Sequence, residues 1–130
     1  MASIQKFEDL VLWQKSKDFT IKIYKLTELE KFAKDYGLKE QIRRASVSIP
    51  SNIAEGFDRK GNKEFIQFLH ISLGSLAEVK TQLIIAFELE YINNENLEIL
   101  NQEIIEIQKL LKGLINYLKN SQLKGSKFTT

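Results

Sequence analysis

Apolar residues recur every three or four positions along almost the whole chain, and this spacing constrains the fold more than any other feature. The longest regular run lies near the C-terminus and contains Leu97, Leu100, Ile104, Ile107, Leu111, Leu114 and Leu118. Residues spaced in this way lie on one face of an α-helix, whereas a half-buried strand requires strict alternation. The 130 residues include one proline and six glycines, too few to mark out a series of β-turns. An all-α fold is therefore predicted.

Four helices are predicted from this pattern, over residues 7–29, 38–57, 63–91 and 95–119, followed by a flexible tail at 121–130. The first connection is the charged, aperiodic stretch 28–35. Asn62 is expected to cap the third helix, and Gly74 within that helix to allow a neighbouring helix to approach closely. Four amphipathic helices with short connections most economically form a single domain, residues 1–130, with the fold of an antiparallel up-down-up-down four-helix bundle.

The only proline, Pro50, lies inside the apolar pattern of the second predicted helix. A proline there leaves the carbonyl of Ser46 without its helical hydrogen bond and costs about 3 kcal/mol. Because the apolar pattern continues through it in phase, we predict one helix kinked at Pro50. Four polar residues surround it: Ser48, Ser51, Asn52 and Glu55. They could form a recognition surface, but the stronger interpretation is structural, in which they satisfy freed backbone groups and bond to Ser75 or Glu78.

Composition excludes several classes of protein. Apolar residues make up 43% of the chain and charged residues 28%, as in ordinary globular proteins. No apolar run approaches the roughly 18–20 residues that a membrane-spanning helix needs, and no signal peptide is recognised. The absence of cysteine rules out disulfides and thiolate metal sites. A cytoplasmic protein is expected.

Catalytic and metal-binding patterns are also missing from the sequence. The only histidine, His70, is preceded three residues earlier by Gln67, so the Glu-x-x-His pair of di-iron helical bundles is absent. No glycine-rich phosphate loop or Ser-His-Asp set is present. The chain is therefore predicted not to be an enzyme and to carry no cofactor or metal, with His70 in a structural or surface role.

Charge is unevenly distributed although the net charge is only +2. Six acidic residues and no basic residue lie between Glu88 and Gln108. In an up-down bundle, the acidic third connection lies at one end of the molecule. The second connection and the C-terminal lysines lie together at the opposite end. The residues of this basic end are Arg59, Lys60, Lys63, Lys119, Lys124 and Lys127. They are candidates for binding nucleic-acid phosphates, although exposed lysines are often simply solvated. Arg43 and Arg44 lie toward the acidic end and are expected to neutralise it.

The second predicted helix also carries a family resemblance. Its segments are Gln41-Ile42-Arg43-Arg44-Ala45 and Ser48-Ile49-Pro50-Ser51-Asn52-Ile53-Ala54-Glu55-Gly56. They resemble the signature of the four-helix-bundle family encoded by intervening sequences in bacterial 23S rRNA genes. The family often has Phe-Pro in the first connection, where this chain has Phe32-Ala33. The motif residues expected to be structural are Ser48, Pro50, Ser51, Asn52, Glu55 and Gly56.

The resemblance carries expectations about assembly and partners. Members of the family are similar to the accessory variability protein of diversity-generating retroelements, which forms a homopentamer with a basic surface that contacts nucleic acid and reverse transcriptase. The resemblance therefore implies that this chain forms a homo-oligomer, a pentamer by analogy, and that it contacts RNA or DNA.

Two functions from different classes follow. The first is a non-enzymatic oligomeric scaffold that associates with nucleic acid, RNA before DNA, through a basic surface. The alternative is a protein–protein interaction module with no nucleic-acid role, whose contact residues are Ile99, Leu110, Ile115 or Tyr117. A small-molecule-binding bundle is a third possibility and would require a cavity in the core.

Overall fold

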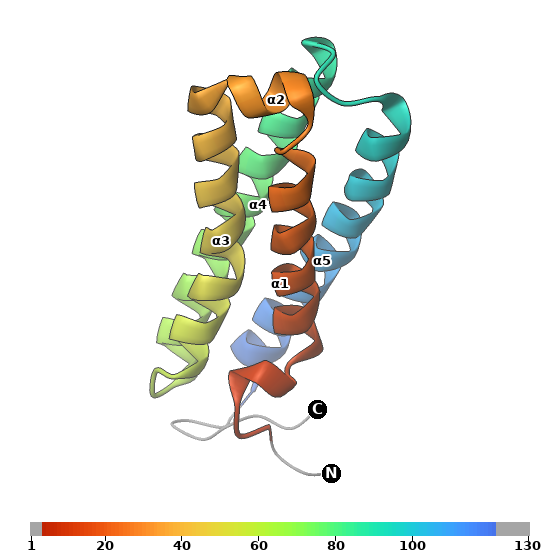
Figure 1. Cartoon of the computed structure of the whole chain (residues 1–130). Helices are drawn as coiled ribbons and strands as arrows, with labels where there is room; N and C mark the ends of the chain where they lie inside the picture. The colour runs from red at the N-terminus through yellow and green to blue at the C-terminus, as the bar shows by residue number, and fades with distance from the viewer. Residues whose placement is uncertain (1–3, 122–130) are drawn as a thin grey trace.

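Four long helices make up most of residues 4–121, the part of the chain that the computed structural model describes (Figure 1). Together with two short elements they follow the order η1 (Phe7–Asp9, a 3-10 helix), α1 (Val11–Leu26), α2 (Glu30–Lys34), α3 (Tyr36–Phe57), α4 (Asn62–Glu88) and α5 (Asn94–Asn120). This described part contains five α-helices and no strand. The predicted all-α class is confirmed. The predicted tail falls outside the described residues from position 122 onward.

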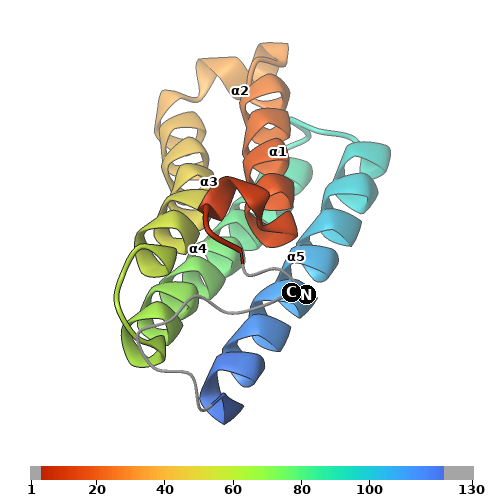
Figure 2. The ribbon, with the colours of Figure 1, turned by 90° about the horizontal axis from the view of Figure 1, so that it is seen from below.

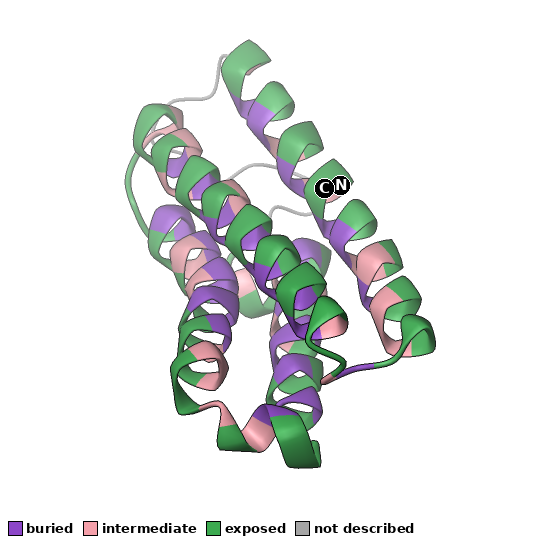
Figure 3. Cartoon of the chain, turned by 90° about the horizontal axis from the view of Figure 1, so that it is seen from above, coloured by how far each residue is buried: buried purple, intermediate pink, exposed green. Residues whose placement is uncertain are grey.

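The long helices lie side by side, and their connections alternate between the two ends of the molecule. Figure 1 shows α2 crossing between α1 and α3 at the top, where the connection between α4 and α5 also lies. The connection between α3 and α4 lies at the bottom with the end of α5. Figure 3 shows that the buried residues face the interior and the exposed ones face outward. Such a distribution is the expected result of packing amphipathic helices together.

The core is made by the predicted apolar faces. Its fully buried large side chains are Phe19, Ile23, Phe32, Ile42, Ile49, Ile53, Leu69, Leu76, Val79, Leu83, Ile107 and Leu111. The regular run on α5 is buried at five positions and half-buried at Leu97 and Leu114. Helical spacing therefore identified the core-facing side of each long helix.

The first helix is shorter than predicted because the backbone leaves the helical region at Leu10. That residue has φ −73° and ψ 125°, which separates η1 from α1, and its side chain is buried. Phe7 packs against Trp13 with their ring centroids 5.2 Å apart. At the other end α1 stops at Leu26, where the hydroxyl of Thr27 donates to the carbonyl of Tyr24 at 2.8 Å.

The charged stretch predicted as a loop contains the short helix α2. Phe32 is its anchor, with none of its surface exposed, and its ring lies 5.6 Å from that of Tyr91. The charged residues on either side of Phe32 hid this helix from a search for periodicity. Helix α3 then starts at Tyr36, two residues earlier than predicted, because Oδ1 of Asp35 accepts from the amide of Leu38 at 3.1 Å and caps it.

Two predictions about α4 are wrong. Its N-cap is Gly61, whose φ of 96° suits glycine, and not Asn62, which is the first helical residue. Nor does Gly74 permit a close helix approach, since a β-carbon there would have no neighbouring atom within 4 Å. The close approach is at Gly56 on α3, where a β-carbon would lie 2.8 Å from the β-carbon of Phe68 on α4.

The turn between α4 and α5 explains why α4 ends at Glu88 and not at Tyr91. The amide of Tyr91 donates to the carbonyl of Ala86 at 2.8 Å and that of Glu90 to Phe87 at 2.9 Å, the pair of bonds that defines a Schellman motif. Glu90 takes the left-handed conformation, with φ 64°. Asn93 and Asn96 then form a capping box at the start of α5.

Candidate nucleic-acid interface

The structure brings the described residues of the basic end together. Arg59 and Lys60 lie in the connection between α3 and α4, Lys63 in the first turn of α4, and Lys119 in the last turn of α5. A hydrogen bond joins the two helix ends, since Nδ2 of Asn62 donates to the carbonyl of Leu118 at 3.1 Å. Figure 2 shows this end of the molecule from below. Lys124 and Lys127, the other two predicted residues, lie outside the described residues.

These cations differ in how far the protein already engages them. Arg59 forms an ion pair of 2.9 Å with Glu55, and its guanidinium lies 5.0 Å from the centroid of the Phe68 ring. Lys60, Lys63 and Lys119 are exposed, and none of them forms an ion pair within residues 4–121. The helix dipole disfavours a cation in the first turn, so Lys63 does not stabilise α4. Three of the four described cations are therefore available to a phosphate.

Pro50 lies within α3, and the backbone carbonyl that it frees has a partner on another helix. Oγ1 of Thr20 on α1 lies 2.8 Å from the carbonyl oxygen of Ser46. The same hydroxyl lies 2.9 Å from the carbonyl of Ser16, one turn earlier in α1. Both contacts are buried. A threonine on α1 thus replaces the hydrogen bond that a proline cannot make.

The polar residues around Pro50 bond mainly to the protein itself. Nδ2 of Asn52 donates to the carbonyl of Ser48 at 2.8 Å and lies 2.9 Å from its hydroxyl. The hydroxyls of Ser48 and Ser75 are 2.8 Å apart, and that of Ser72 donates to the carbonyl of Ile49 at 2.9 Å. The contacts of Ser75 and Ser72 join α4 to α3, which supports the structural interpretation of the motif. Ser51 and Glu55 are the exposed members of the set.

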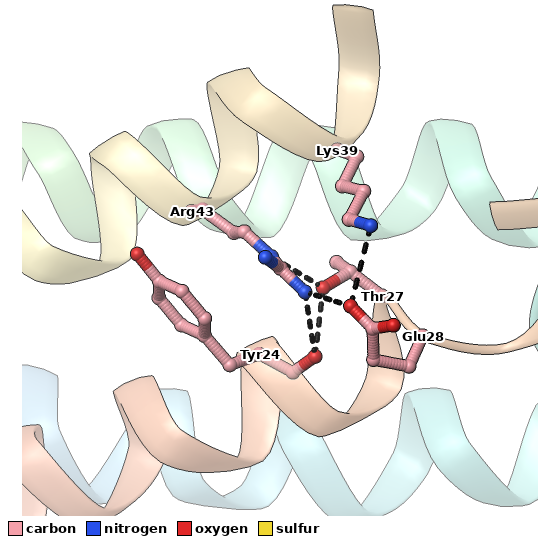
Figure 4. A network of polar contacts seen from close by, with 5 residues as sticks. All are labelled: Tyr24, Thr27, Glu28, Lys39 and Arg43. Atoms are coloured by element: carbon pink, nitrogen blue, oxygen red, sulfur yellow. Dashed lines mark hydrogen bonds and ion pairs between the residues drawn. The ribbon is translucent and has the colours of Figure 1, made fainter. Parts of the chain in front are cut away.

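Another polar network, which the sequence analysis missed, lies near the opposite end (Figure 4). Nε of Arg43 donates to Oγ1 of Thr27 at 2.8 Å, and its Nη2 donates to the carbonyl of Tyr24 at 3.2 Å and to the carboxylate of Glu28. Nζ of Lys39 lies 3.2 Å from the same carboxylate. Arg43 thereby satisfies the Tyr24 carbonyl at the C-terminal end of α1 and does more than neutralise acidic residues.

Two ionisable groups at this end have shifted pKa values. The pKa of Glu28 is lowered by the hydrogen bond from Arg43 and, after it, the hydrogen bond from Lys39. The pKa of Tyr91 is raised, chiefly because its hydroxyl donates to Asp35 at 2.9 Å. Since Asp35 also caps α3, this contact joins the start of α3 to the turn after α4.

The remaining features considered in the sequence are the histidine, a metal site and a membrane-spanning helix. His70 lies exposed on α4. Residues 4–121 contain no group of three histidine, aspartate or glutamate side chains arranged to hold a metal ion. Among the same residues, no helix combines the length and apolar character needed to cross a membrane.

Comparisons with known proteins agree with the architecture. Residues 8–113 match the model of a family described as 23S rRNA-intervening sequence protein. The chain also resembles the crystal structure of a protein of unknown function from the S23 ribosomal protein family of Bacteroides thetaiotaomicron. The two are 33% identical with a TM-score of 0.75, over 81% of this chain and 98% of that one. No curated protein matches the chain.

Proposed function

Because this chain belongs to the 23S rRNA-intervening sequence protein family, we propose that it is a non-enzymatic, cytoplasmic scaffold that associates with nucleic acid. The preferred nucleic acid is RNA, and the contact surface is the basic end. The observation that carries the proposal is the convergence of Lys60, Lys63 and Lys119, three exposed lysines without carboxylate partners in the described chain. Cations placed in this way neutralise phosphates without reading a base sequence.

Self-association forms part of the proposal. Four cations on one protomer neutralise only a few phosphates and give weak, salt-sensitive binding. A homo-oligomer multiplies these contacts on one strand and raises the overall affinity by avidity. The resemblance to the accessory variability protein suggests a pentamer as the specific form.

We further propose that the fold is an antiparallel up-down-up-down four-helix bundle with α3 kinked at Pro50. The alternating ends of the connections support this topology (Figure 1). Pro50 cannot donate a hydrogen bond to the carbonyl of Ser46. The hydroxyl of Thr20 on α1 occupies that carbonyl instead, and a bend of α3 toward α1 would accommodate this contact.

A protein–protein interaction module is the second candidate, and exposed apolar residues on α5 favour it. Ile99 is 51% exposed and Tyr117 is 40% exposed, so part of each side chain faces solvent. Ile115, proposed for the same role from the sequence, is only 5% exposed and belongs to the core, and Leu110 is half-buried. This candidate predicts a partner protein and no salt-dependent binding to RNA.

An RNA titration at two salt concentrations tests the leading proposal. Fluorescence anisotropy with a labelled single-stranded RNA would give the affinity at 50 and 200 mM salt, and light scattering would give the mass of the protein. For three phosphate contacts, one for each unpaired lysine, we expect the affinity to fall about 20-fold between these conditions. A monomer with no affinity for RNA would contradict both parts of the proposal.

Charge reversal locates the interface. We expect the double variant Lys60→Glu with Lys63→Glu to lose most RNA affinity, because both lysines are exposed and unpaired in the described chain. The matched control is Lys80→Glu with Lys109→Glu, which makes the same change in net charge on the exposed surfaces of α4 and α5. Equal losses in the two variants would show that net charge, and not the basic end, governs binding.

A further inference from the structure

We propose that the open groove between α1 and α3 binds single-stranded nucleic acid by stacking bases on Tyr24 and Tyr36. This inference rests on the proposed function and adds to it a second contact site of different chemistry. The groove has a volume of about 380 Å³ and is lined by Tyr24, Tyr36, Lys39, Glu40, Arg43 and Arg44. It lies near the beginning of α3, at the opposite end of that helix from Arg59 and Lys60.

Two aromatic rings line this groove, and both are accessible. Tyr36 is the first residue of α3 and is 77% exposed, the highest value among the large apolar and aromatic side chains of residues 4–121. Tyr24 is 39% exposed and projects from α1. Single exposed aromatics are common on protein surfaces, but two in one groove that is also lined by cations match a stacking platform for unpaired bases.

The Tyr24 ring is held in place before any ligand arrives. The guanidinium of Arg43 lies over it, 4.4 Å from the ring centroid (Figure 4). That guanidinium is itself fixed by Thr27, by the Tyr24 carbonyl and by Glu28. A ring with a fixed orientation loses little conformational freedom on binding, which favours affinity. The same contacts tie the end of α1 to α3 through Arg43 and Lys39, and they do not involve Tyr36.

The charges around the rings suit a phosphate backbone, although weakly. Lys39, Arg43 and Arg44 outnumber Glu40, the one carboxylate in the lining. Arg44 is the most accessible of these cations, with 79% of its side chain exposed, and its ion pair with Glu40 is also exposed. Glu28 pairs with both Lys39 and Arg43 and offsets part of their positive charge. Base stacking, and not charge, must therefore supply most of the affinity of this groove for a nucleic acid.

The two sites therefore divide recognition between them. At the basic end, the Phe68 ring lies beneath the guanidinium of Arg59. The groove offers rings but few unpaired charges. A single strand that reached both sites would have its phosphates neutralised at one and its bases stacked at the other.

The test compares two labelled 20-nucleotide strands, oligo(rU) and an abasic strand with the same number of phosphates. We expect Tyr36→Ala to weaken oligo(rU) binding about 5- to 150-fold with an unchanged salt dependence. The same substitution should leave binding of the abasic strand unchanged. Tyr36→Phe keeps the ring and is expected to bind within about twofold of the wild-type protein.

A measurement on the unaltered protein complements the variants. An oligo(rU) strand carrying photoreactive 4-thiouridine is expected to crosslink to peptides that contain Tyr24 or Tyr36, as mapped by mass spectrometry. Crosslinks confined to other segments would overturn the inference.

The outcomes separate this inference from the proposed function. If the wild-type protein binds RNA in a salt-dependent way but Tyr36→Ala binds equally well, the groove is not a nucleic-acid site and the basic end stands. If binding survives the Lys60→Glu and Lys63→Glu double variant but falls with Tyr36→Ala, the groove stands and the basic end does not. A wild-type protein that binds neither strand would overturn both.

Discussion

The hydrogen bond between Thr20 and the carbonyl of Ser46 makes a quantitative prediction about stability. Replacing Thr20 by valine keeps the shape of the side chain but removes the donor, and leaves a buried carbonyl that Pro50 cannot satisfy. An unsatisfied buried carbonyl costs about 1–3 kcal/mol. With a urea m-value of about 1.5 kcal/mol/M, a loss of about 2 kcal/mol lowers the unfolding midpoint by about 1.3 M.

A double-mutant cycle isolates the part of this loss that depends on the proline. In the Pro50→Ala background the new amide can donate to Ser46, so Thr20→Val should then cost less than about 0.5 kcal/mol. The expected coupling free energy is therefore about 1–2 kcal/mol. Both backgrounds would be unfolded in urea at one protein concentration and followed by circular dichroism.

The control is another helical threonine with a similar local contact. Oγ1 of Thr81 lies 3.0 Å from the carbonyl of Ala77, one turn earlier, much as Oγ1 of Thr20 lies 2.9 Å from that of Ser16. The Thr81 contact is exposed and involves no carbonyl freed by a proline. We expect Thr81→Val to change stability by less than about 0.5 kcal/mol. Equal losses for Thr20→Val with and without Pro50 would refute the idea that this hydroxyl compensates for the proline.

Three further predictions concern the glycines, the turn after α4 and the ion pairs of Arg43. Gly56→Ala should destabilise the protein by about 1–3 kcal/mol because its β-carbon meets α4, whereas Gly74→Ala should stabilise it by about 0.5–1 kcal/mol, and urea unfolding of both compares them. Glu90→Gly should raise stability by about 0.5–1 kcal/mol by relieving the left-handed backbone, and an unchanged melting temperature would argue against strain there. The folded-state pKa of Glu28 is lowered, so its stabilising effect is present at neutral pH and is lost in acid, below about pH 4. Glu28→Gln should therefore lose less stability than the wild-type protein over that acid range, and equal losses would contradict this.

Most of the fold could be predicted from the sequence because helical spacing is a local signal. The residues that line one face of α5 are three or four positions apart, and their burial follows directly from that spacing. The same reasoning identified the Ser46 carbonyl as the group that Pro50 leaves unsatisfied. Phe32 shows where the signal fails, because a single buried ring among charged neighbours has no periodicity to detect.

The candidate sites were predictable only in part. The cations of the basic end could be found because they flank connections that the helix pattern located. The groove could not, because Tyr24 and Tyr36 belong to separate helices and no motif links them. An aromatic residue in a helical sequence is normally assigned to the core, and only packing shows which ones remain outside.

The sequence by itself determined which segments are helical, which face of each is apolar and which carbonyl the proline frees. Those properties depend on residues within a few positions of each other. Only the tertiary structure decided that Thr20, 26 residues away, satisfies that carbonyl, that Gly56 and not Gly74 lies against another helix, and that Arg43 holds the end of α1. Such pairings depend on the rotation and offset of packed helices, which side-chain packing across the whole core sets.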